Sequence, residues 1–192
     1  MDALTKALVA GAIGLAAGLW SSESVLRVTS GLDARTIGAW TASVDAGVQE
    51  ADPYTRASIE RSGEIPLALG EGLQLVAHTD DSGAALSPRC VYRVGSRAPA
   101  ARYWTLGLVD RVGFPVDNAA KRAVFRSSEL LRDEKGGFVI TVSADARAGN
   151  WLPIGGSQRF YLVLRLYDSP FSATAAAIDK DALPRIVRES CR

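Results

Sequence analysis

The segment 160–167 constrains the fold of this chain more than any other stretch of its sequence. Successive side chains of a β-strand point to opposite faces, so this segment would present two different faces. One face is entirely apolar, and the other carries Tyr161, Val163 and Tyr167 beside a single charged residue, Arg165. A strand with two largely apolar faces is covered on both sides, so we expect a central strand of a layered β structure.

The rest of the chain predicts further short strands separated by turns. Candidate strands are 70–79, 89–94, 102–110, 122–126 and 138–143, with turns rich in Asp and Gly at 80–83 and 133–137. Helices are few: Asp52 and Pro53 suit the start of a short helix over 53–62, and another is expected over 172–179. Because helices do not alternate with strands, we predict a mainly β fold, an antiparallel jelly-roll-like β-sandwich, with a doubly wound α/β fold as the alternative.

Composition and motifs exclude several functional classes. The formal net charge is +1, and no block of Lys and Arg alternates with aromatic residues, so no nucleic-acid partner is expected. One histidine, His78, and two cysteines do not supply a zinc site. The sequence has no Gly-x-Ser-x-Gly elbow, P-loop or Rossmann fingerprint. We therefore predict no catalytic residue, metal or cofactor, and the sequence favours a protein that is not an enzyme without deciding the matter.

The N-terminal segment 4–22 is long and apolar enough to cross a membrane. At about 1.5 Å per residue it would span roughly 28 Å, close to the thickness of the hydrocarbon layer. Lys6 can reach one interface, and Trp20 suits the other. A single-pass anchor in the lipid bilayer is one interpretation. A cleaved signal peptide and a buried helix of a soluble domain are the others.

Three glycines in this segment could form a contact with another helix. Gly14 and Gly18 are four residues apart, with Gly11 nearby, and such small-residue spacing lets membrane helices approach closely. With an anchor, the chain divides into three parts: a transmembrane anchor or uncleaved signal anchor at 1–24, a linker at 25–50 and a β-sandwich domain at 51–192.

The two cysteines can be read as a disulfide or as free thiols. Cys90 precedes a strand-like run, and Cys191 is the penultimate residue. If they pair, the closed loop of about 100 residues stabilises the fold by about 4–5 kcal/mol in the chain-entropy model. The bond would also hold the C-terminus. Pairing requires an oxidising compartment, which would place the main domain outside the membrane, whereas two partly buried thiols would not.

Four polar or aromatic residues are candidate ligand-binding groups. Asn150 and Trp151 could line a ligand cleft, or they could form a packed corner in which Asn satisfies turn amides. Arg165 is a charged residue on a central strand, so it must be paired or face a polar cavity. A buried pair with Asp110 is one possibility, and bidentate binding of a carboxylate or phosphate ligand is the other.

Five short motifs occur in a distinctive order between residues 102 and 168. They are Tyr103-Trp104-Thr105-Leu106, Val109-Asp110-Arg111-Val112-Gly113-Phe114, Ser127-Ser128, Gly149-Asn150-Trp151-Leu152-Pro153 and Leu164-Arg165-Leu166-Tyr167. Their order and spacing resemble the bacterial family Domain of Unknown Function 1214. The run from Asp52 to Ala57 and the cysteine pair are similar to a small membrane-anchored branch of that family. The resemblance implies a jelly-roll-like β fold and association with a companion family, Domain of Unknown Function 1254, but no activity.

These observations lead to two functional hypotheses. In the first, the chain is a membrane-anchored, periplasm-facing accessory or structural protein of the bacterial inner membrane that binds another membrane or envelope protein. In the second, it is a jelly-roll domain that binds a small anionic or sugar-like molecule and could be an enzyme. An accessory protein should have a filled core and an exposed apolar patch, whereas a ligand binder should have an open cleft with an unpaired Arg165.

Overall fold

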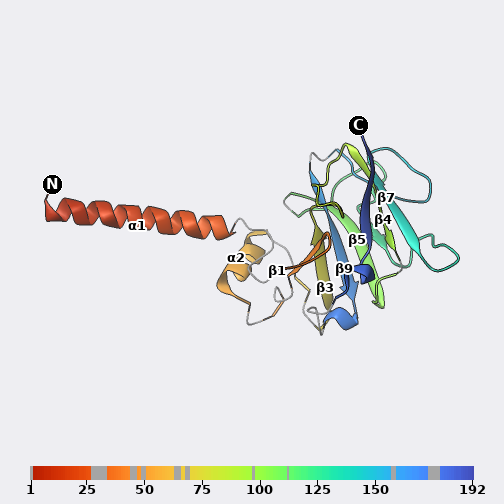
Figure 1. Ribbon diagram of the computed structural model, residues 1–192, viewed down its shortest axis with the longest axis horizontal. Helices are drawn as coiled ribbons and strands as arrows, with labels where there is room; N and C mark the ends of the chain where they lie inside the picture. The colour runs from red at the N-terminus through yellow and green to blue at the C-terminus, as the bar shows by residue number, and fades with distance from the viewer. Residues whose placement is uncertain are drawn as a thin grey trace.

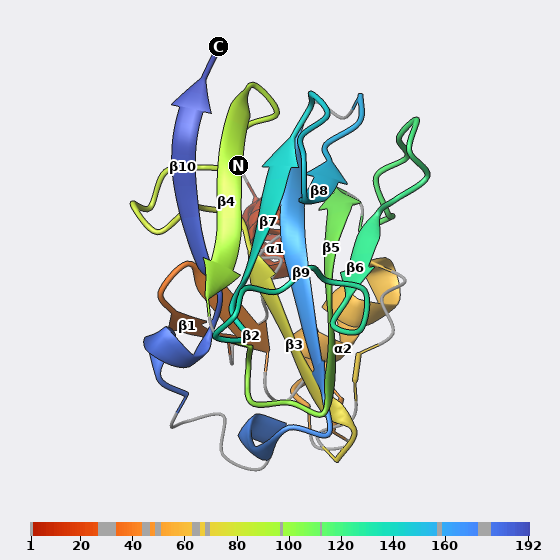
Figure 2. The ribbon, with the colours of Figure 1, turned by 90° about the vertical axis from the view of Figure 1, so that its right-hand side faces the viewer.

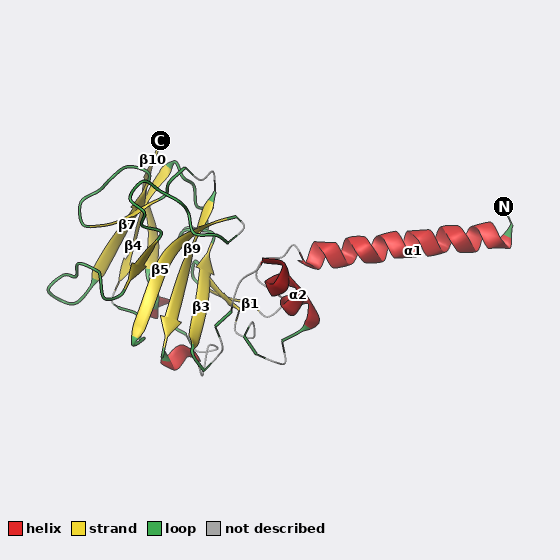
Figure 3. Ribbon diagram, turned by 180° about the vertical axis from the view of Figure 1, so that it is seen from behind, coloured by secondary structure: helices red, strands yellow, loops and turns green. Residues whose placement is uncertain are grey.

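The computed structural model describes residues 2–26, 34–43, 47–48, 51–62, 66–67, 70–96, 98–111, 113–156, 159–172 and 178–192. In these ranges the chain forms ten strands in two sheets, together with two α-helices and short 3₁₀ turns (Figure 1). Figure 3 shows how little of the body of the molecule is helical. The fold is therefore mainly β, as the sequence predicts.

The larger sheet has six strands and the smaller has four. The larger follows the order β1 (Ala34–Ile37), β2 (Trp40–Ser43), β3 (Gly72–Ala77), β9 (Phe160–Tyr167), β5 (Tyr103–Asp110) and β6 (Val124–Arg126). The smaller follows the order β10 (Arg185–Cys191), β4 (Cys90–Ser96), β7 (Phe138–Ser143) and β8 (Asn150–Pro153). The helices are α1 (Ala3–Leu26), α2 (Pro53–Ser62), and the 3₁₀ turns η1 (Pro170–Ser172) and η3 (Lys180–Ala182).

Strand β9 lies in the middle of the larger sheet, as its two apolar faces predict. It pairs antiparallel with β3 on one side and with β5 on the other. Leu162, Leu164 and Leu166 are fully buried in the core that the two sheets share. Aromatic rings from the two sheets meet in this core, since Trp104 and Phe138 have ring centroids 4.7 Å apart. Figure 2 shows the smaller sheet lying in front of the larger one.

One strand pair departs from the antiparallel prediction. Strands β7 and β8 are parallel, with Ile140 opposite Asn150 and Ser143 opposite Pro153. The connection 144–149 folds back along β7, so β8 runs in the same direction as β7. Asn150 and Trp151, expected at a corner or a cleft, therefore lie on a short edge strand.

Three other strands and one helix bear on the remaining predictions. Strands β1 and β2 lie within the stretch expected to be a linker, and β2 pairs with β3. Strand β10, which is not among the predicted strands, pairs with β4. Of the helix expected over 172–179, residues 173–177 lie outside the described residues.

The start of α2 forms as predicted. The Asp52 carboxylate oxygen Oδ1 accepts hydrogen bonds from the backbone N–H groups of Tyr54 at 2.9 Å and Thr55 at 3.1 Å. These are N–H groups of the first turn, which have no partner within the helix. The Thr55 hydroxyl donates to the other carboxylate oxygen. Asp52 is therefore the N-cap of α2.

Helix α1 extends away from the two sheets (Figure 1). Among the described residues it is the one helix long and apolar enough to cross a membrane, and none of its membrane-length window is buried. This exposure argues against a buried helix of a soluble domain. A signal sequence near the N-terminus would have the same length and composition, so the anchor and signal-peptide interpretations remain.

Candidate functional site

Asn150, at the start of β8, has a structural role, because its side chain binds backbone groups of other segments. Its side-chain oxygen accepts the Leu131 N–H at 2.8 Å. Its amide nitrogen donates to the carbonyl oxygens of Leu131 at 2.8 Å and Val139 at 3.0 Å. The side chain is buried, and these three bonds join the β6–β7 connection to β7 and β8. Asn150 therefore serves the protein's own backbone.

Trp151 completes a packed corner. Its indole N–H donates to the Ser143 carbonyl at 3.1 Å, and its own carbonyl accepts a hydrogen bond from Arg122 at 3.3 Å. The next residues, Leu152 and Pro153, are buried. This geometry favours the corner over the cleft that Asn150 and Trp151 could have lined.

Replacing Asn150 with Asp is expected to lower the free energy of unfolding by about 2–3 kcal/mol. The carboxylate keeps an acceptor for the Leu131 N–H, but it cannot donate to the Leu131 and Val139 carbonyls and would repel them. Urea unfolding checks this, with Trp151→Phe as the comparison, because that change loses a single hydrogen bond. Unchanged stability of Asn150→Asp would mean that the hydrogen bonds of Asn150 do not stabilise the fold.

Arg165 and Asp110 do not form the predicted ion pair. Arg165 is opposite Thr105 across the β9–β5 ladder, whereas Asp110 is opposite Phe160 at the far end of that ladder. Five residues of strand separate the two positions, roughly 17 Å, and they lie on opposite faces of the sheet. Asp110 instead accepts the Phe114 N–H at 3.0 Å and stabilises the turn after β5. The strand register therefore keeps Arg165 and Asp110 apart.

Gly11, Gly14 and Gly18 leave an open face on α1. A Cβ added at any of the three would meet no atom within 4 Å beyond the adjoining residues and backbone of α1 itself. This face is accessible in the single chain, and its contact with another helix stays a prediction.

The cysteines are joined. Cys90 and Cys191 form a disulfide that links residues 101 positions apart in the sequence. They are also the last register pair of β4 and β10. Cys90 is buried, whereas Cys191 is exposed. The bond ties β10, at the edge of the smaller sheet, to the neighbouring strand β4.

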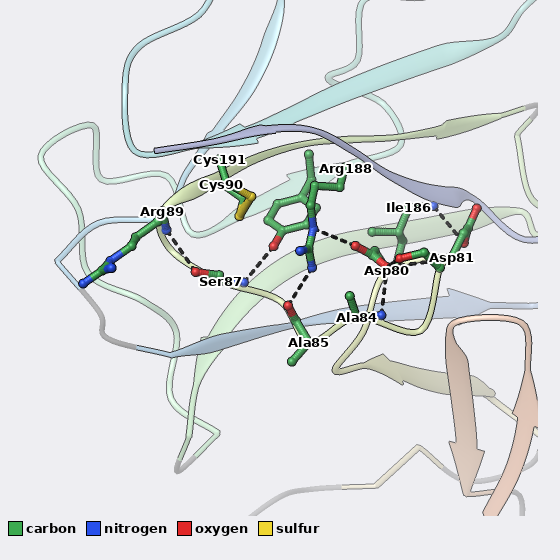
Figure 4. A network of polar contacts seen from close by, with 12 residues as sticks. Asp80, Asp81, Ala84, Ala85, Ser87, Arg89, Cys90, Ile186, Arg188 and Cys191 are labelled. Atoms are coloured by element: carbon green, nitrogen blue, oxygen red, sulfur yellow. Dashed lines mark hydrogen bonds and ion pairs between the residues drawn. A yellow bond between two sulfur atoms is a disulfide. The ribbon is translucent and has the colours of Figure 1, made fainter.

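A second attachment of β10 was not predicted from the sequence. The Asp80 carboxylate is almost fully buried, and its Oδ2 lies 2.8 Å from Nε of Arg188 in β10 (Figure 4). Next to it, Asp81 accepts the Ile186 N–H at 3.2 Å and donates its own N–H to the Ile186 carbonyl at 2.9 Å. The sequence placed Asp80 and Asp81 in a turn, but it carries no local signal for a partner more than 100 residues away.

A cavity of about 300 Å³ lies beside this attachment. Its lining includes Trp40, Asp81, Lys180, Pro184 and Arg185. Asp81 and Arg185 are already paired at 3.1 Å, and the Trp40 indole N–H donates to the Pro184 carbonyl at 2.7 Å. These groups hold the β1–β2 turn against the start of β10.

Comparison with known proteins finds one matching family and similar solved structures. Residues 71–171 match the family described as Protein of unknown function (DUF1214). Among solved structures, the chain is similar to the VPA0106 protein from Vibrio parahaemolyticus, with a TM-score of 0.57, 21% identity, and coverage of 73% of this chain and 36% of that one. A sequence identity of 21% supports a shared fold and nothing more.

A second solved structure is a putative uncharacterized protein from Burkholderia cenocepacia, with a TM-score of 0.42 and 18% identity. That match covers 90% of this chain and 47% of the other. The chain thus spans less than half the length of either solved protein. No curated protein matches it.

Proposed function

This chain belongs to the DUF1214 family of proteins of unknown function, and we propose that it is a membrane-anchored, periplasm-facing accessory protein that binds another membrane or envelope protein. We place it in the bacterial inner membrane, as a member of a small membrane-anchored branch of the family. Its two sheets would form a jelly-roll-like sandwich. The observation that carries the proposal is the apolar helix α1, none of whose membrane-length window is buried.

The dimensions of α1 support an anchor. Its apolar part, Ala3–Ser24, has 22 residues, which at about 1.5 Å each gives roughly 33 Å, enough to cross a hydrocarbon layer of about 30 Å. In water, exposure of this apolar surface would be unfavourable by about 25 cal/mol per Å². A lipid bilayer removes that cost, and Lys6 and Trp20 suit its two interfaces.

The disulfide supports the orientation. Disulfides persist in oxidising compartments and are rare in the cytosol. The Cys90–Cys191 bond is therefore consistent with a domain on the periplasmic side of the inner membrane. The N-terminus of α1 would then lie on the cytoplasmic side.

The packed corner supports an accessory role over a ligand cleft. Asn150 and Trp151 use their side-chain polar groups to bind the protein's own backbone. Two of the four candidate ligand residues therefore have a structural role. We propose the glycine face of α1 as one contact with the partner. A Domain of Unknown Function 1254 protein is one candidate partner, and the greater length of the solved relatives is consistent with additional domains acting beside this fold.

A second candidate function is the binding of a small anionic or sugar-like molecule, with or without an enzymatic step. Arg165 favours it, because its guanidinium is not paired with Asp110. The contacts of Arg165 define what such a site would recognise.

The accessory role predicts that a membrane partner is recovered with the full chain in roughly equal amounts. The measurement is a pull-down from native membranes in mild detergent, followed by mass spectrometry. The variant Gly14→Leu/Gly18→Leu should lose the partner, because bulky side chains keep a second helix at a distance. The control Ala12→Leu/Ala16→Leu adds similar bulk to the opposite face of α1 and should keep it. Recovery of all three chains without a partner would contradict the proposal.

A further inference from the structure

Arg165 lies in the middle of the outer face of the six-stranded sheet. Its neighbours Leu164 and Leu166 point into the core, so Arg165 points away from it. Across the ladders its register partners are Gln74 on β3 and Thr105 on β5. The guanidinium Nε donates to the Gln74 side-chain oxygen at 2.7 Å. This bond fixes one edge of the guanidinium on a rigid strand.

The other edge of the guanidinium is available. Within the described ranges, Gln74 provides the one hydrogen bond that the side chain of Arg165 makes. Among the described residues, the buried side-chain atoms without a hydrogen bond are Oδ2 of Asp80 and Nε of Arg188, which form an ion pair with each other. The terminal nitrogens of Arg165 are not among these buried atoms, so they reach solvent. These nitrogens form a planar fork whose geometry matches the two oxygens of a carboxylate. A fork already fixed by Gln74 loses little conformational entropy when it binds.

Among the described residues, Arg165 differs from two neighbouring arginines in having no carboxylate partner. Two other arginines near this row already have carboxylate partners: Arg126 with Glu129 at 2.6 Å, and Arg102 with Asp168 at 3.7 Å. Arg165 has no such partner among the described residues. Arg165 therefore offers one positive charge that no carboxylate of the described residues neutralises, which suits a carboxylate ligand.

Two tyrosines form the next row of the same face. Tyr103 and Tyr167 are register partners, and their ring centroids are 5.7 Å apart. Tyr167 is two residues from Arg165, so the two side chains share a face of β9. Both rings are half-buried and offer a flat apolar surface beside the guanidinium.

We propose that Arg165, with Thr105, Tyr103 and Tyr167 around it, is a binding site for a carboxylate group on an apolar or aromatic body. The carboxylate belongs either to a small organic acid or to an acidic side chain of another protein. This inference goes beyond the accessory role, because the site would exist whether or not α1 has a partner in the membrane.

The test is a titration of the full chain in detergent micelles, followed by nuclear magnetic resonance of the arginine Nε–H groups. The probes are benzoate and its neutral counterpart, benzamide. Benzoate is expected to shift the Arg165 signal to saturation, while benzamide leaves it unchanged. Arg93, an exposed arginine on the other sheet that is already paired with Glu189, serves as the internal control and should not respond.

Variants distinguish the effect of the guanidinium's hydrogen-bonding geometry from the effect of its positive charge. Arg165→Gln is expected to weaken benzoate binding by about tenfold or more, and Arg165→Lys by less, because it keeps the charge without the fork. Arg93→Gln should bind as the wild type does. Equal shifts at Arg165 and Arg93, or equal binding of benzoate and benzamide, would overturn the proposal. These two comparisons use wild-type protein, so they decide the matter even if a variant does not fold.

A peptide pair distinguishes the two sources of the carboxylate. A short peptide with one glutamate is compared with the same peptide carrying glutamine. Tighter binding of the glutamate peptide than of benzoate supports a protein ligand, and the reverse supports a small organic acid. Failure of both glutamate peptide and benzoate to shift Arg165 rejects the site, while leaving the pull-down result for the accessory role untouched.

Discussion

Replacing Cys191 with serine is expected to lower the free energy of unfolding by about 2–5 kcal/mol. The disulfide closes a loop between residues 101 positions apart, so the unfolded chain gains much freedom when the bond is lost. Cys191 is exposed, and a serine there buries no hydroxyl. Cys90 is buried, so the same change at Cys90 would add the cost of a buried polar group.

Urea unfolding of the full chain in detergent measures this effect. Wild-type protein treated with a dithiol reductant should lose about as much stability as Cys191→Ser. The variant should lose nothing further in the reductant. Equal stability of the oxidised wild type and the variant would show that the bond does not support β10.

Replacing Arg188 with methionine is expected to lower the free energy of unfolding by about 3 kcal/mol. The Asp80 side chain is 1% exposed, and Arg188 is the cation that lies against its Oδ2. Without Arg188, that oxygen would be buried without a counter-charge. The double variant Asp80→Asn/Arg188→Met removes the charge as well and should recover most of the loss. A double variant as unstable as the single one would rule out this explanation.

The same pair predicts a dependence on pH. Burial by itself would raise the pKa of Asp80, but hydrogen bonds from Ser82 and Ala84 and the charge of Arg188 together hold this pKa below its usual 3.8. A carboxyl whose pKa is lowered by folding stabilises the folded state above its unfolded pKa, and this contribution is lost as the pH falls through the folded pKa. Unfolding measured as the pH is lowered below 3.8 should therefore cost the wild type more stability than Asp80→Asn.

Local patterns in the sequence predicted the parts of the fold that local chemistry determines. The two apolar faces around Arg165 indicated a central strand, and β9 is that strand. Asp52 before Pro53 indicated a helix start, and it caps α2. The pairing of Cys90 with Cys191 was one of two open readings, and the structure has the disulfide.

The remaining features depend on contacts between distant segments. β8 is parallel to β7 because the connection between them folds back, and the composition of that loop does not reveal this. A pair of Arg165 with Asp110 was one of two interpretations, but strand register places the two residues far apart. The Asp80–Arg188 pair joins a turn to the last strand across more than half of the chain. Such partners are set by topology, so one sequence read by its local patterns does not identify them.

We propose that α1 anchors this chain in the inner membrane with the β domain outside. The most direct measurement is the mass and protease sensitivity of the chain in spheroplasts, which expose the periplasmic face. We expect an intact chain of 20.3 kDa in the washed membrane fraction, with its β domain cut by protease added from outside. A shorter soluble chain lacking α1, or a β domain protected until the membrane is opened, would contradict the claim.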